Sequence, residues 1–201
     1  MMTGLQLKPD GEIETYSLGG DTTEYKILLG ELKELLQPLT KTFKKIFSIK
    51  NKIPKHYEKI LKSNSEPVLM KAYKLNGSLF FVRYKDFERV NFFDERVFMY
   101  FEEDILATKI KKLGRSVGIY SGVTFTHYHN VAIDRYGEKF WKNMKLDKIF
   151  NRSAIFFFNN YMTSNKLLQM FYASLRWFNF YKDFVLVKLP LKLVKLLLKS
   201  K

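Results

Sequence analysis

The chain of 201 residues contains no cysteine. Disulfide bonds, a thiolate nucleophile and a zinc site with cysteine ligands are therefore excluded. The chain also lacks an uncharged apolar stretch long enough to cross a bilayer, because Lys, Arg and Asp interrupt even its most apolar region, residues 167–198. Residues 1–9 show no basic segment followed by an apolar run, so we expect no signal peptide.

Acidic residues are scarce relative to basic ones. The 35 Lys and Arg residues outnumber the 20 Asp and Glu residues, which gives a net charge of +15. Such an imbalance implies an anionic partner, which can be nucleic acid, anionic lipid or a phosphorylated substrate. Because 46% of the residues are hydrophobic and 16% are aromatic, a sizeable folded core is expected.

The spacing of apolar residues and the turn signals predict a mixture of strands and helices up to about residue 139. We expect a strand and turn within residues 1–20, and strands within 68–83 and 116–128. We expect helices over residues 24–36, 85–91 and 102–113. The first helix should end before Pro38, and Gly114 should cap the third.

The tail, residues 140–201, differs in character from the rest of the chain. It is rich in aromatic residues, Leu and Lys, and its only acids are Asp147 and Asp183. After Pro190, three lysines fall on one helical face: Lys192, Lys195 and Lys199. The pattern predicts a basic amphipathic helix that lies on an anionic membrane surface. The alternative is a pair of helices that packs on the preceding domain with its lysines in water.

A series of motifs occurs in a fixed order in the middle of the chain. In chain order they are LNGSLFF at 75–81, FERV at 87–90, FFDERVFMYFEEDIL at 92–106, KLG at 112–114 and HYH at 127–129. This series resembles the second half of bacterial family 2 glycosyltransferases, the rhamnosyltransferase-like group that builds surface polysaccharides. The opening GLQLKPDG at 4–11 also resembles the segment that follows the metal-binding motif in that family.

The resemblance implies an α/β fold and an enzymatic function. Residues 1–139 would form an incomplete GT-A-like, Rossmann-like domain with a mixed sheet, the acceptor-side half of the enzyme, and residues 140–201 a helical basic tail. The complete enzyme would transfer a sugar, with inversion, from a nucleotide-sugar to a surface-polysaccharide or lipid-linked acceptor. It would act in the cytoplasm, peripherally bound to the inner face of the cytoplasmic membrane.

An inverting transfer needs a base that takes the proton of the acceptor hydroxyl. The family's base corresponds by position to Glu103, with Asp104 as a rival and Glu102 beside them as a substrate contact. Because adjacent helical residues point about 100° apart, only one of these acids can face the site well. The alternative is that all three simply stabilise the start of a solvated helix.

Four further residues match positions that the family uses to bind its substrates. Gly77 and Ser78 match a stretch that passes close to the donor sugar, and alone they would be read as a turn. Asp94 and Glu95 match a loop beside the acceptor, and they could instead cap that loop.

Metal binding is a further implication of the resemblance. His127 matches a histidine near the diphosphate or its metal, and His129 would share its strand face. The alternative is a pair of partly buried strand histidines. The complete enzyme would need Mg²⁺ or Mn²⁺ to neutralise the leaving diphosphate.

The chain contains no Asp-x-Asp motif, which binds that metal in GT-A enzymes. We therefore expect a fragment of a longer or split enzyme, a half that pairs with a separate nucleotide-binding subunit, or an inactive relative. A non-catalytic membrane-surface or scaffold protein is the second class. A nucleic-acid-binding module is the third, although no helix-turn-helix, zinc-finger or RNA-binding motif supports it.

Overall fold

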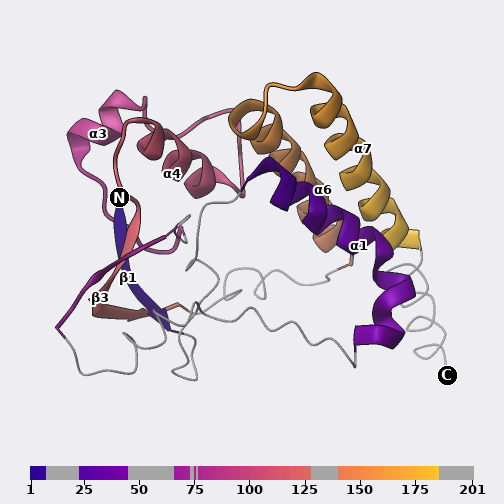
Figure 1. The fold of residues 1–201 in the computed structure, drawn as a ribbon, viewed down its shortest axis with the longest axis horizontal. Coiled ribbons are helices and arrows are strands. Elements are labelled where there is room, and N and C mark those ends of the chain that lie inside the picture. Colours follow the sequence, from indigo (N-terminus) through magenta and orange to yellow (C-terminus); the bar gives the residue numbers. More distant parts are fainter. Residues whose placement is uncertain (8–22, 45–65, 73–74, 76, 128–139, 186–201) are drawn as a thin grey trace. The chain divides into compact units, whose positions relative to one another are not determined.

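The computed structural model describes residues 1–7, 23–44, 66–72, 75, 77–127 and 140–185 (Figure 1). The chain divides into two compact units. Unit 1 consists of Met1–Thr22 and Phe47–Tyr136, and unit 2 consists of Thr23–Ile46 and Gly137–Lys201. Unit 1 combines a sheet with helices and the described part of unit 2 is helical, so the chain is of the predicted α/β class.

Three strands form one mixed sheet in unit 1. They are β1 (Met2–Leu7), β2 (Leu69–Lys71) and β3 (Gly118–Thr126), within the three regions that the sequence predicts to be extended. The strand order is β1-β3-β2, so β3 is central, parallel to β1 and antiparallel to β2. The predicted turn at residues 9–11 lies outside the described residues.

Close contact between β1 and β3 depends on one glycine. The register of the two strands shifts between Gly4 and Leu5. A Cβ on Gly4 would lie 2.6 Å from the backbone carbonyl oxygen of Val123. Because a carbonyl oxygen in a strand cannot move away cheaply, this irregular pairing requires glycine.

Two helices accompany this sheet, both where they were predicted. They are α3 (Tyr84–Arg89) and α4 (Glu102–Lys112). Helix α4 buries Leu106, Ala107 and Ile110 in the core of unit 1. The other buried residues of this core come mainly from the strands and their neighbours: Leu5, Met70, Ala72, Leu75, Val90, Val117 and Ile119.

The predicted glycine cap of α4 is confirmed. Gly114 adopts a left-handed conformation with a φ of 73°. The N–H groups of Gly114 and Arg115 donate hydrogen bonds to the carbonyls of Lys111 and Ile110, at 2.8 and 3.2 Å. This Schellman motif satisfies two carbonyls that the helix end would otherwise leave without donors.

Unit 2 contains three α-helices and one π-helical turn in its described residues. These are α1 (Glu24–Lys44), α6 (Phe140–Phe157), η1 (Phe158–Met162) and α7 (Lys166–Asp183). Helix α7 packs against both α1 and α6 (Figure 1). The buried apolar cluster of unit 2 consists of Leu28 of α1, Phe158 and Tyr172. The rings of Phe158 and Tyr172 stack with their centroids 4.1 Å apart.

The predicted end of α1 is wrong, and the division into units differs from the predicted domain boundary. The helix does not end before Pro38 but continues to Lys44. A proline within a helix removes one hydrogen bond and bends the helix without always ending it, and Figure 1 shows α1 changing direction. Residues 23–46 also join the tail helices in unit 2, whereas the sequence analysis placed them in the first domain.

A polar network joins the three α-helices of unit 2. Arg176 donates from Nη1 to Oε1 of Glu31 and from Nε to Oδ1 of Asn151, both at 2.7 Å. Asn179 donates to the backbone carbonyl of Glu31 at 3.0 Å and to its Oε2 at 3.2 Å. The network therefore fixes α7 against α1 and α6.

The basic helix predicted after Pro190 lies outside the described residues. Among the residues that are described, none of the helices is both long and apolar enough to cross a membrane.

Candidate functional site

Two of the motifs that carry the resemblance meet in unit 1. The backbone N–H of Gly77 donates a hydrogen bond of 2.9 Å to Oε1 of Glu103, which is 26 residues further along the chain. A Cβ on Gly77 would lie only 2.5 Å from the same oxygen. Glycine therefore lets the carboxylate approach the backbone closely at this point.

Strand β1 also holds the segment that contains Gly77. The hydroxyl of Thr3 donates to the carbonyl of Leu79 at 2.6 Å, and the hydroxyl of Ser78 donates to Oε1 of Gln6 at 3.2 Å. Thr3 and Gln6 are both buried, so these contacts are shielded from water. The segment from Gly77 to Leu79 thus connects β1 to the first turn of α4.

The three acids at the start of α4 lie in different environments. Glu102 and Glu103 are half-buried, and Asp104 is buried with an exposed fraction of 6%. Burial raises the pKa of the Glu102 carboxyl above its usual value, and the neighbouring carboxyl groups of Glu103 and Asp104 raise it further. A hydrogen bond from the backbone N–H of Glu102 itself acts in the opposite direction.

The backbone before α4 is strained, although no residue type in this segment predicts such strain. Tyr100 and Phe101 have φ values of 66° and 68°, in the left-handed region that bulky residues rarely adopt. Phe101 is also the N-cap of α4, and its side chain makes no capping hydrogen bond. Such strain persists only where the surroundings impose it, and it is common at functional sites.

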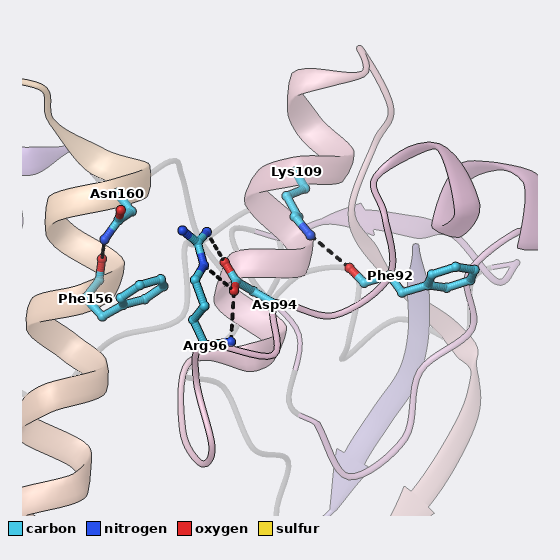
Figure 2. Close-up of polar contacts among 6 residues, drawn as sticks. All are labelled: Phe92, Asp94, Arg96, Lys109, Phe156 and Asn160. Atoms are coloured by element: carbon cyan, nitrogen blue, oxygen red, sulfur yellow. Dashed lines mark hydrogen bonds and ion pairs between the residues drawn. The ribbon is translucent and has the colours of Figure 1, made fainter.

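Asp94 is held by an arginine in the same loop (Figure 2). Its carboxylate accepts hydrogen bonds from Nε and Nη2 of Arg96 at 2.9 and 2.7 Å, and from the Arg96 backbone N–H at 3.1 Å. Asp94 is buried, whereas Glu95 beside it is exposed. The structure therefore gives Asp94 a role in ordering this loop and leaves Glu95 accessible.

Lys109 of α4 joins the same loop to the helix. Its Nζ donates to the backbone carbonyl of Phe92 at 2.9 Å (Figure 2). Burial lowers the pKa of the Lys109 ammonium, the negative charge of Asp94 opposes this change, and Arg96 adds to it. Phe92 has a φ of 52°, so this contact fastens a second left-handed segment.

A buried carboxylate that the sequence analysis did not single out lies in α3. Asp86 pairs with Arg83 at 2.7 Å and with Arg115 at 3.2 Å. Burial alone would raise the pKa of Asp86, but hydrogen bonds from both arginines outweigh it and lower the pKa. Arg115 follows the cap of α4, so this pairing is visible only once α3 and α4 are folded together.

One of the two histidines predicted near the metal lies among the described residues. His127 is half-buried and follows the last residue of β3, whereas His129 lies outside the described residues. No group of three or more His, Asp or Glu side chains that could hold a metal ion occurs among the residues whose placement is described.

Comparisons with protein-family models, with curated proteins and with solved structures found no match to this chain. Any functional assignment therefore depends on the residues and their geometry.

Proposed function

We propose that this chain is the acceptor-side half of an inverting, family 2-like glycosyltransferase with a GT-A-like fold. Its substrates would be a nucleotide-sugar donor and a surface-polysaccharide or lipid-linked acceptor. The donor-binding residues would be supplied by a further segment or by a separate subunit that carries the Asp-x-Asp motif. The proposal rests on the resemblance of the motifs and on their arrangement in unit 1.

The observation that carries the proposal is the hydrogen bond between Gly77 and Glu103. The resemblance assigns the glycine–serine segment to the donor sugar and the acidic start of α4 to the base. An enzyme of this kind needs these two elements side by side, because the base must reach the hydroxyl that attacks the sugar. The hydrogen bond of 2.9 Å between the Gly77 nitrogen and Oε1 of Glu103 supports the proposal, because it brings the two elements side by side.

Glu103 is the better candidate for the base. Asp104 is buried, whereas Glu103 is half-buried and more accessible to a substrate hydroxyl. Its bond to the Gly77 N–H orients the carboxylate. Glu102, Ser78 and the loop with Asp94 and Glu95 would contact or position the two sugars.

The proposed transfer is a displacement at the anomeric carbon of the donor sugar. The Glu103 carboxylate takes the proton of an acceptor hydroxyl while the hydroxyl oxygen forms a bond to the anomeric carbon. The bond from that carbon to the nucleoside diphosphate breaks, and the diphosphate leaves with the bonding electron pair. Attack from the face opposite the leaving group inverts the configuration.

The divalent cation expected in the complete enzyme would stabilise the leaving diphosphate. The described residues do not fit a cation site, since they contain no suitable cluster of ligands. The Asp-x-Asp motif of the nucleotide-binding half would hold the cation, and His127 remains a predicted contact near the diphosphate.

The test begins with the DNA upstream of Met1, which we expect to encode a half that carries Asp-x-Asp. The two halves, joined or coexpressed, should release a nucleoside diphosphate from a nucleotide-sugar when a lipid-linked acceptor is present. Glu103→Gln should lower this rate by about a hundredfold or more. Gly77→Ala should lower it less, because the added Cβ displaces the carboxylate without removing it.

The matched control is Glu66→Gln, which changes an exposed carboxylate ahead of β2 and should leave the rate unchanged. A Glu103→Gln variant with the wild-type rate would exclude Glu103 as the base. If no such half is encoded and the chain alone releases no diphosphate from any nucleotide-sugar tested, the transferase proposal fails.

A further inference from the structure

Helix α7 presents an apolar face to solvent along its whole length. Its members recur at helical spacing along the whole helix and have exposed fractions between 50 and 77%. They are Leu167, Met170, Phe171, Phe178 and Tyr181, and we call them the α7 apolar face. The exposed residue that interrupts them at the same spacing is Ser174, so the stripe carries no charge.

The packing of unit 2 does not use this face. The opposite side of α7 carries its buried residues Tyr172, Leu175 and Asn179, and the helix packs against α1 and α6. A helix that already has a buried face normally exposes polar residues on its other side. A contiguous exposed apolar stripe of this length therefore indicates an interaction surface.

Charge decides which partner fits the face. Residues 140–201 contain twelve Lys and Arg residues but only two acids. Exposed members of this set include Lys166 at the start of α7 and Lys145, Lys148 and Arg152 on α6. Pairing with a second copy through this face would bring two strongly basic regions together, whereas an anionic bilayer attracts them.

We propose that the α7 apolar face binds the surface of an anionic membrane, with α7 lying in the interfacial plane. The apolar side chains enter the boundary between headgroups and acyl chains, and the positive charge of residues 140–201 attracts them to anionic headgroups. Tyr181 and the neighbouring Trp177 suit this depth, because each combines an apolar ring with a polar atom. The inference does not depend on the proposed transferase activity.

The test compares two double variants of the full chain in a vesicle flotation assay. The vesicles contain phosphatidylcholine and phosphatidylglycerol in equal parts. Phe171→Gln/Phe178→Gln should weaken binding by about tenfold or more, because two large apolar side chains no longer enter the membrane. The matched control is Tyr25→Gln/Leu29→Gln, which changes two equally exposed apolar residues on α1 and should bind like the wild type.

A fluorescence measurement places the helix in the membrane directly. In a Trp141→Phe background, Trp177 is the single tryptophan of the chain. Lipids brominated on their acyl chains should quench its emission, and pure phosphatidylcholine vesicles should bind far more weakly than anionic ones. Because Phe171, Phe178, Tyr25 and Leu29 are all exposed, circular dichroism should show unchanged helix content in both double variants.

Three outcomes would overturn the inference. In the first, the α7 double variant binds anionic vesicles as tightly as the wild type does. In the second, Trp177 is not quenched in bound protein. In the third, the wild type forms a dimer without lipid, the α7 variant abolishes that dimer, and neither protein floats; the face would then bind a second copy.

Discussion

Glu102 shows how one residue at the start of α4 lies in an environment that favours its neutral form. Burial and two adjacent carboxyl groups raise the pKa of its own carboxyl. The folded state therefore binds this proton more tightly than the unfolded state does. The stability that results is fully present below the ordinary value of 4.5 and is lost as the pH rises through the folded pKa.

Replacing Glu102 with Gln should remove this loss, because the amide is neutral at every pH. We expect Glu102→Gln to match the wild type in stability below pH 4.5 and to become the more stable protein as the pH rises. Urea denaturation followed by circular dichroism at a series of pH values measures the difference.

Asp86→Asn provides the control of opposite sign. The pKa of Asp86 is lowered by its two arginines, so its contribution is present above the ordinary value of 3.8 and is lost as the pH falls through the folded pKa. The variant should therefore be less stable than the wild type at neutral pH, and the gap should narrow in acid. The same trend in both variants would contradict this account.

At the scale of single residues, candidate site residues could be named from the sequence, but not all of their contacts and backbone conformations could be predicted. The resemblance grouped Gly77 with Glu103, and the two are in contact. The left-handed Tyr100 and Phe101 could not be foreseen, since neither residue favours that conformation. The pairing of Asp86 with Arg115 joins two residues that are 29 positions apart, so no local pattern predicts it.

At the scale of elements, a nearly buried ion pair joins α7 to α1 in unit 2. The side chains of Arg176 and Glu31 are 17 and 12% exposed, and their nitrogen and oxygen lie 2.7 Å apart. Removing one member of such a pair leaves the other charged and poorly solvated.

Arg176→Leu should therefore destabilise unit 2 by about 3 kcal/mol, and Glu31→Leu/Arg176→Leu should be less destabilised than the single variant. Urea denaturation followed by tryptophan fluorescence measures this, because both tryptophans of the chain, Trp141 and Trp177, belong to unit 2. Arg152→Leu, at an exposed position on α6, is the control and should change stability by no more than about 0.5 kcal/mol. A double variant that is less stable than Arg176→Leu would refute the argument.

Elements with strong local signals were predictable. Helix α4 has acids in its first turn, lysines in its last turn and Gly114 after it, and it lies where the sequence placed it. Helix α1 was predicted too short because a proline usually ends a helix, whereas Pro38 lies within α1. The packing of α1 against α7 is a tertiary contact, which a short stretch of sequence does not reveal.

At the scale of the whole molecule, unit 2 is assembled from two separate parts of the chain. Helix α1 comes from the N-terminal quarter of the sequence and packs with helices that begin at residue 140. The composition of the tail suggested a boundary near residue 139, but it contains no information about α1. Leu28, which packs with Phe158 and Tyr172, joins the two parts through apolar contacts.

Leu28→Ala should lower the free energy of unfolding of unit 2 by about 2–4 kcal/mol, because it leaves a cavity beside Phe158. Its neighbour Leu29 is 54% exposed, and Leu29→Ala should change stability by no more than about 0.5 kcal/mol. Tryptophan fluorescence during urea denaturation distinguishes them. Equal effects of the two variants would show that α1 does not belong to unit 2.

The pairing of β1 with β3 also has a consequence for synthesis on the ribosome. Met1 and Ser116, which join the two strands at their start, are 115 residues apart. At a translation rate of about 5–20 residues per second, roughly 6–23 s pass between the synthesis of β1 and the start of synthesis of its parallel partner β3. The interval between the synthesis of Glu31 and that of Arg176 is longer still, because these residues are 145 positions apart. Neither unit can complete its fold while the first half of the chain is being translated, so the nascent chain depends on protection from aggregation during that interval.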